Sequence, residues 1–148
     1  MKHLPLLGAL FLCASPVVAD EFIYVECDAT LLTEVIDPET SEVLGSFPER
    51  DIKVYKIDTK NSTIENKDSF FAAYRDKAVG VEISDGQITY SANDKNGGFV
   101  AMKLKFNPPG KISGNGGGDM LKSGKIYNVK MSLSGSCSNA DASSYLSQ

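Results

Sequence analysis

Apolar and polar residues alternate along several segments of the chain. The alternation is clearest over residues 100–107 and again over residues 127–134, where every second residue is apolar. A period of two is typical of a strand with one face buried. Weaker strand signals lie at roughly 42–47, 52–57 and 62–65, separated by turn-forming residues. The pattern therefore predicts a protein built mainly from half-buried strands.

The segment 81–90 predicts a β-hairpin with a defined register. Asp85-Gly86 stands at its centre, between two short alternating runs. Asp-Gly is favoured in two-residue hairpin turns because both turn positions need a positive φ. With this turn, Ile83 is expected to pair with Ile88 on the apolar face.

These signals predict one antiparallel all-β domain over residues 20–137. We expect a single β-sandwich, immunoglobulin-like or similar, and a closed or flattened β-barrel is the alternative that length and turn spacing also allow. One segment breaks the alternation. Residues 69–77 predict a short helix, with a strand as the alternative because Phe and Tyr also favour sheets.

A local resemblance favours the sandwich. The segment Leu121–Tyr127 is similar to the approach to the tyrosine corner in immunoglobulin-like and fibronectin type III domains. In those domains a proline precedes the glycine, whereas Ser123 stands there in this chain. The resemblance covers seven residues and implies a fold but no function.

The N-terminus has the pattern of a secretory signal peptide over residues 1–19. Lys2 begins it, an apolar run follows to Cys13, and Ala19 precedes the expected cut. We therefore expect an exported protein, periplasmic or extracellular, with no membrane span after cleavage. The polar residues 138–148 are expected to form a flexible tail.

Two cysteines, Cys27 and Cys137, remain after cleavage. An even count in an exported chain predicts a disulfide. Both cysteines share the parity of the apolar residues around them, so we expect a buried bridge that joins the first strand to the last.

Charge and composition exclude several kinds of function. Without Lys2, 14 basic residues face 19 acidic ones, so a nucleic-acid partner is not expected. The only histidine, His3, leaves with the signal peptide, which excludes histidine-dependent triads and zinc helices. Carboxylates remain, and Glu34, Asp37, Glu39 and Glu42 lie close together around a turn. We expect no cofactor and no metal site.

A glycine-rich segment at 108–122 is the candidate contact surface. It is predicted to be a surface loop, because it contains few apolar residues and many glycines. Its spacing does not match a phosphate-binding loop. The candidate contact residues are Lys111, Ser113, Asn115, Asp119 and Lys122.

The sequence thus predicts an exported, non-enzymatic binding or inhibitory β-domain. Its expected partner is a protein or a small ligand. One alternative is a structural or surface-assembly subunit, which would present a free edge strand. The other is a carboxylate-dependent hydrolase, which would place two carboxyl groups in one cleft.

Overall fold

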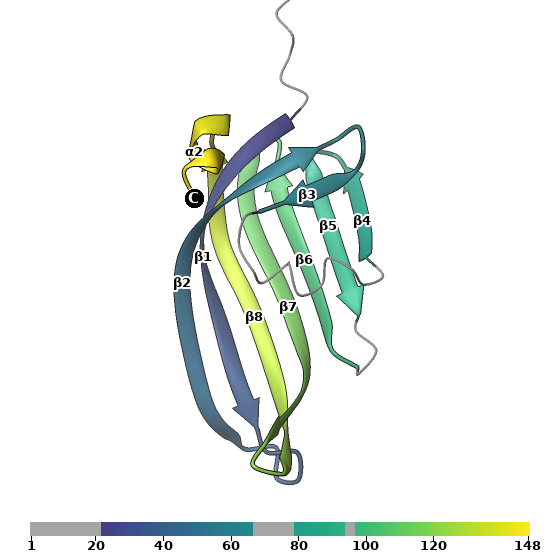
Figure 1. The fold of residues 1–148 in the computed structure, drawn as a ribbon, viewed down its shortest axis with the longest axis vertical. Coiled ribbons are helices and arrows are strands. Elements are labelled where there is room, and N and C mark those ends of the chain that lie inside the picture. The colour runs from purple at the N-terminus through teal and green to yellow at the C-terminus, as the bar shows by residue number, and fades with distance from the viewer. Residues whose placement is uncertain (1–21, 67–78, 94–96) are drawn as a thin grey trace, which may run out of the picture.

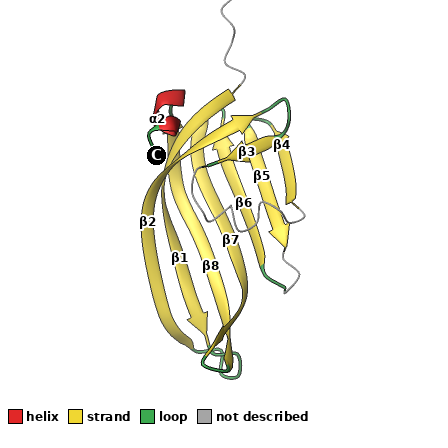
Figure 2. Cartoon of the chain, in the orientation of Figure 1, coloured by secondary structure: helices red, strands yellow, loops and turns green. Residues whose placement is uncertain are grey.

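The computed structural model describes residues 22–66, 79–93 and 97–148. The described strands, followed by one short helix, are β1 (Phe22–Ile36), β2 (Val43–Asp58), β3 (Thr63–Glu65), β4 (Val79–Ser84), β5 (Gln87–Asn93), β6 (Phe99–Phe106), β7 (Pro109–Lys122), β8 (Lys125–Asn139) and α2 (Ala142–Leu146). The strands form one antiparallel sheet in the order β3-β2-β1-β8-β7-β6-β5-β4 (Figure 2). Residues 1–19 and the predicted helix at 69–77 lie outside the described residues.

The sheet curls around one concave face (Figure 1). The all-β prediction is confirmed. The arrangement is that of the barrel alternative, left open between the end strands β3 and β4, with all eight strands in a single sheet. Two long hairpins, β1–β2 and β7–β8, reach the end of the molecule opposite the C-terminus (Figure 1). We call this end the tip.

The hydrophobic core lies on the concave face in the half of the molecule away from the tip. It contains the predicted hairpin, in which Ile83 pairs with Ile88 as expected and both Asp85 and Gly86 have positive φ. The core includes Val25, Ile57, Ile88, Met102, Leu104 and Ile112. Alternate residues of each strand point into it, as the period-two pattern predicts.

The disulfide between Cys27 and Cys137 is confirmed. The two cysteines are directly opposite each other on β1 and β8. Cys27 is only 1% exposed and belongs to the core, whereas Cys137 is partly buried against it. The bridge therefore joins the first strand to the last from the concave side.

The segment 108–122 is not a loop, and this prediction was wrong. Residues Pro109–Lys122 form strand β7, which pairs with β6 on one side and β8 on the other. Gly114, Gly116 and Gly118 occupy successive positions on the concave face, where neighbouring strands come too close for a side chain. The glycines are compatible with a strand, but they have no side chains, so the sequence lacks the apolar alternation by which a strand is predicted.

The tyrosine-corner resemblance at Leu121–Tyr127 does not correspond to a corner. Ser123 and Gly124 form the two-residue turn of the β7–β8 hairpin, and Lys122 pairs with Lys125 across it. Both turn residues have positive φ, +53° and +79°. This is the geometry that matches the twist of a hairpin, so the segment connects neighbouring strands of one sheet.

Strand β2 runs unbroken through Pro48, where the sequence predicted two shorter strands. The N–H of Val54 donates to Gln148 Oε1 at 3.0 Å, so the backbone of even-numbered residues here points away from β1. Pro48 has the same parity, and its missing N–H costs no bond to β1. The proline is therefore tolerated because the strand is at an edge.

The polar C-terminal segment 138–148, which the sequence predicts to be a flexible tail, contains the end of strand β8 and a short helix. Strand β8 continues to Asn139, and Asp141 caps the short helix α2 by accepting from the N–H of Ser144. Gln148 then bonds to the free edge of β2, accepting from Val54 and donating to the carbonyl of Ile52. The segment thus protects part of an edge strand.

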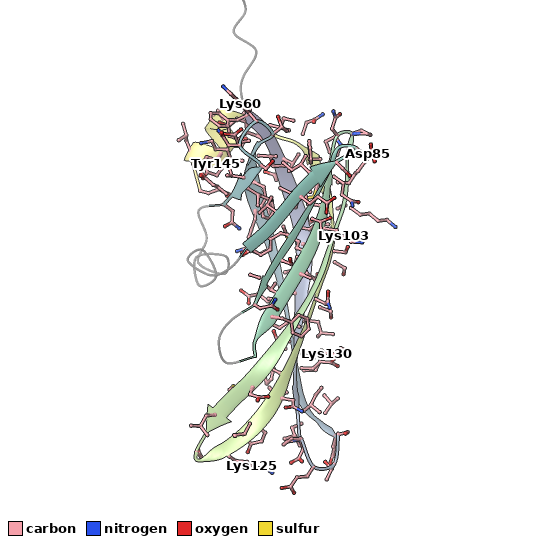
Figure 3. The ribbon with its side chains drawn as sticks, turned by 90° about the vertical axis from the view of Figure 1, so that its right-hand side faces the viewer. Lys60, Asp85, Lys103, Lys125, Lys130 and Tyr145 are labelled. Carbon is pink, nitrogen blue, oxygen red and sulfur yellow. A yellow bond between two sulfur atoms is a disulfide. The ribbon has the colours of Figure 1, made fainter. Side chains whose placement is uncertain are left out.

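One ion pair joins the two hairpins at the tip. Lys125 Nζ donates to Asp37 Oδ2 at 2.8 Å, and the N–H of Glu39 and of Thr40 donate to Asp37 Oδ1. Lys125 is the largest cause, with the two backbone donors, of a pKa for Asp37 of about 2 instead of 3.8. Figure 3 shows Lys125 at this end of the molecule.

This ion pair predicts a pH dependence of stability. A lowered folded-state pKa means that ionised Asp37 stabilises the fold above about pH 4, and that this contribution is lost as the pH falls towards 2. We expect Asp37→Asn to lower the Tm at neutral pH, and the difference from wild type to vanish near pH 2. Thermal unfolding followed by circular dichroism between pH 7 and pH 2 measures it. Asp119→Asn, at an exposed position on β7, is the control, and a constant Asp37→Asn deficit would contradict the prediction.

Candidate functional site

An open groove lies on the concave face, between the core and the tip. Its volume is about 100 Å³. It is lined by residues of five strands, among them Cys27, Ala29, Leu31, Glu49, Asp51, Lys53, Val100, Met102, Gly114, Gly116, Met131 and Leu133. The groove is therefore a depression in the inner side of the sheet.

The floor of the groove is apolar because strand parity places apolar residues there. Leu31 on β1 is opposite Leu133 on β8, and Leu133 is opposite Gly114 on β7. Met131 occupies the next concave position of β8 and is opposite Gly116. Leu31, Met131 and Leu133 are all partly exposed, so the floor is open to a ligand.

Glycines let the sheet bend closely around the floor. A Cβ at Gly114 would lie 2.8 Å from the carbonyl oxygen of Ala101, and one at Gly116 would lie 2.9 Å from that of Phe99. The Met131 Cε atom lies over Gly116, 3.1 Å from the same Cβ position. Strand β6 therefore approaches β7 more closely than a side chain would allow, and the flexible Met131 covers the space.

Among the described residues, the charged side chains of the groove lie on one wall. Glu49, Asp51 and Lys53 occupy successive concave positions of β2. Lys53 Nζ lies 2.9 Å from Asp51 Oδ2, and Asp51 Oδ1 accepts from the N–H of Ile52 at 2.8 Å. Glu49 is exposed and has no ion pair among the described residues. The described residues of the wall thus carry one net negative charge, that of Glu49.

The apolar floor continues towards the tip as a partly exposed surface. We call this surface the apolar stripe, and it consists of Leu31, Val35, Phe47, Val129, Met131 and Leu133, all on the concave face. Phe47 is 60% exposed. The stripe shares the face of the core but has no layer of described residues over it.

Apart from Asn115, the predicted contact residues do not line the groove. Lys111, Ser113 and Asp119 are exposed on the convex face, and Lys122 lies beside the turn at the tip. Asn115 has the same convex parity and reaches the groove through its backbone. Figure 3 labels Lys103 and Lys130, two further lysines whose parity places them on the convex face.

The acidic residues at 34–42 lie at the tip and do not line the groove. Asp37 is engaged by Lys125. In the part of the chain that the structure describes, no three metal-ligating side chains gather at one point. Nor does any described helix have the length and apolarity to cross a bilayer.

Sequence reasoning identified the apolar faces of β1 and β8 but missed the wall on β2. Glu49 and Asp51 stand in a segment where the sequence predicts a break between strands. A signal existed in Gly114, Gly116 and Gly118, whose spacing of two indicates one face of a strand.

No protein-family model, curated protein or solved structure matches this chain.

Proposed function

We propose that this protein is an exported, non-enzymatic binding domain that takes the apolar part of a ligand into the concave groove. The observation that carries the proposal is the open apolar floor formed by Leu31, Met131 and Leu133. Covering such side chains removes apolar surface from water, which favours binding by about 25 cal/mol for each Å².

The shape of the groove supports a slender ligand. A volume of about 100 Å³ is well below that of a pocket for a drug-sized molecule. The groove and the apolar stripe share Leu31, Met131 and Leu133, so a ligand longer than the groove can continue along the stripe. The proposed ligand is therefore elongated.

Two observations favour binding over the alternatives. The free edge of β2 is occupied at Ile52 and Val54 by Gln148 and lacks a donor at Pro48, which disfavours assembly through this strand. The acidic cluster around Asp37 lies at the tip, where Asp37 is held by Lys125. Two carboxylates, Glu49 and Asp51, do line the groove, but Lys53 and the N–H of Ile52 engage Asp51, so the two do not form a pair of free carboxyl groups. A ligand site on the concave face needs neither an edge nor a catalytic pair.

A neutral apolar dye tests the proposal. We expect N-phenyl-1-naphthylamine to bind the natively folded protein saturably, with a rise in fluorescence. Met131→Asp places a carboxylate on the floor, and we expect it to weaken binding at least about tenfold because a charge must then lose its water. Fluorescence titration measures both affinities.

Ser132→Asp is the matched control. Ser132 is the next residue on β8 and is exposed on the convex face, so the same new charge there should leave dye binding unchanged. Thermal unfolding of both variants confirms that each is folded. Absence of saturable binding by wild type, or equal weakening by both variants, would overturn the proposal.

A further inference from the structure

The length of the apolar stripe fits one hydrocarbon chain. From Leu31 to Val35 the stripe spans four residue steps of β1, or roughly 13 Å, and the groove extends the same face to Ala29, roughly 20 Å in all. A bilayer core of roughly 30 Å is two acyl chains deep, so one chain is roughly 15 Å long. Most of a single acyl chain can therefore lie along the stripe when its head group is at the level of Leu31.

The area of this face is too small for a folded partner. Four strands about 4.8 Å apart and a length of about 20 Å give roughly 300 Å² of sheet face. A standard protein interface covers about 800 Å² on each side. A second copy of this chain, or another globular protein, would thus have insufficient surface here for stable association.

The chemistry of the floor disfavours a peptide. The floor strands β1, β8 and β7 have a sheet neighbour on both sides at the level of Leu31 and Leu133, so their backbone groups are already paired. A peptide laid on this floor would leave its own N–H and C=O groups without partners, at a cost of several kcal/mol in total. A hydrocarbon chain has no such groups.

The charge of the wall indicates the head group. Glu49 is opposite Leu31, the last pair of groove residues towards the tip, so its side chain lies where the groove meets the apolar stripe. Lys53 is paired with Asp51, which leaves the charge of Glu49 uncompensated among the described residues. An anionic head group would be repelled here and a cationic one attracted.

We propose that the ligand of the groove is a single-chain amphiphile with a cationic head group, its chain on the apolar stripe and its head beside Glu49. This inference rests on the proposed function, because it assigns the chemical class of the ligand to the same groove. The head group remains at the open rim, where exposed charges interact weakly, so it sets a preference of modest size.

Three amphiphiles with the same chain test the inference: dodecyltrimethylammonium, dodecyl maltoside and dodecanoate. The affinity of each amphiphile for the wild-type protein is measured by competition with the naphthylamine dye, at neutral pH and low salt and below the micelle concentration of the amphiphile. We expect the cationic compound to bind about three- to tenfold more tightly than dodecanoate, with the maltoside between them. Added salt should reduce the difference.

Glu49→Gln identifies the source of the preference. We expect this variant to bind the maltoside as wild type does and to lose most of the preference for the cation. Glu82→Gln removes one exposed carboxylate from the convex face of β4 and should retain the preference. If the three amphiphiles bind with equal affinity, or dodecanoate binds best, the inference fails while the proposed function stands. If none of them displaces a dye that binds saturably, the inference likewise fails alone; if the dye itself does not bind, both fail.

Discussion

Replacing both Cys27 and Cys137 with alanine is expected to lower the free energy of unfolding by about 4 kcal/mol. The bridge joins residues 110 positions apart, so in the unfolded chain it closes a loop of nearly the whole domain. Long loops lose the most conformational freedom when closed, and this destabilises the unfolded state. Urea unfolding of the two proteins, followed by circular dichroism, measures the difference.

Reduction of the disulfide in the wild-type protein supplies an independent measurement of the stability that the bridge contributes. It should bring the urea midpoint close to that of the double variant, whereas it should leave the variant unchanged. Ser136→Ala, at an exposed position beside the bridge, is the control and should unfold as wild type does. Equal stability of the double variant and wild type would show that the bridge contributes nothing to folding.

The sequence predicted the strands that alternate strictly and the features that depend on local chemistry. The hairpin at Asp85-Gly86 was correct because the turn and the apolar pattern require the same register. The disulfide was correct because parity placed Cys27 and Cys137 on the same side as the core. In both cases two independent signals agreed.

The sequence did not predict features that depend on how strands meet. Gly114 and Gly116 indicated a loop because a strand usually carries side chains on its buried face. In the fold, the carbonyl oxygens of Ala101 and Phe99 lie where those side chains would be. The close approach of β6 to β7 explains these glycines. This approach joins distant parts of the chain, so it cannot be inferred from a local sequence pattern.

The candidate site escaped prediction for a related reason. Leu31 and Leu133 have the same pattern as core residues, and parity alone does not tell which part of an apolar face stays uncovered. The uncovered part results from the long hairpins, which extend the concave face beyond the core (Figure 1). The charged wall on β2 follows Pro48 in a strand that continues without a break. A proline ordinarily indicates the end of a strand, so the sequence did not predict strand residues there.

The same dependence on strand contacts makes Gly135 a sensitive position. Gly135 is opposite Ala29 on the concave face, in the region where the sheet bends. A Cβ there would overlap the carbonyl oxygen of Asp28 and would lie 2.6 Å from both Cα and Cβ of Ala29. Because these atoms belong to the backbone and its first side-chain atom, they cannot move without shifting β1.

Gly135→Ala is therefore expected to destabilise the fold by about 2–3 kcal/mol, as overpacking does. The sign is informative, because an alanine in place of a glycine within a strand ordinarily stabilises by about 0.5–1 kcal/mol. Gly110→Ala is the matched control, since the nearest atoms to its Cβ belong to the flexible side chain of Lys105, at 3.3 Å. Urea unfolding should show loss of stability for Gly135→Ala and a neutral or slightly stabilising effect for Gly110→Ala. If Gly135→Ala were as stable as Gly110→Ala, β1 and β8 would be further apart at this point than described, and the close bend that forms the groove would be wrong.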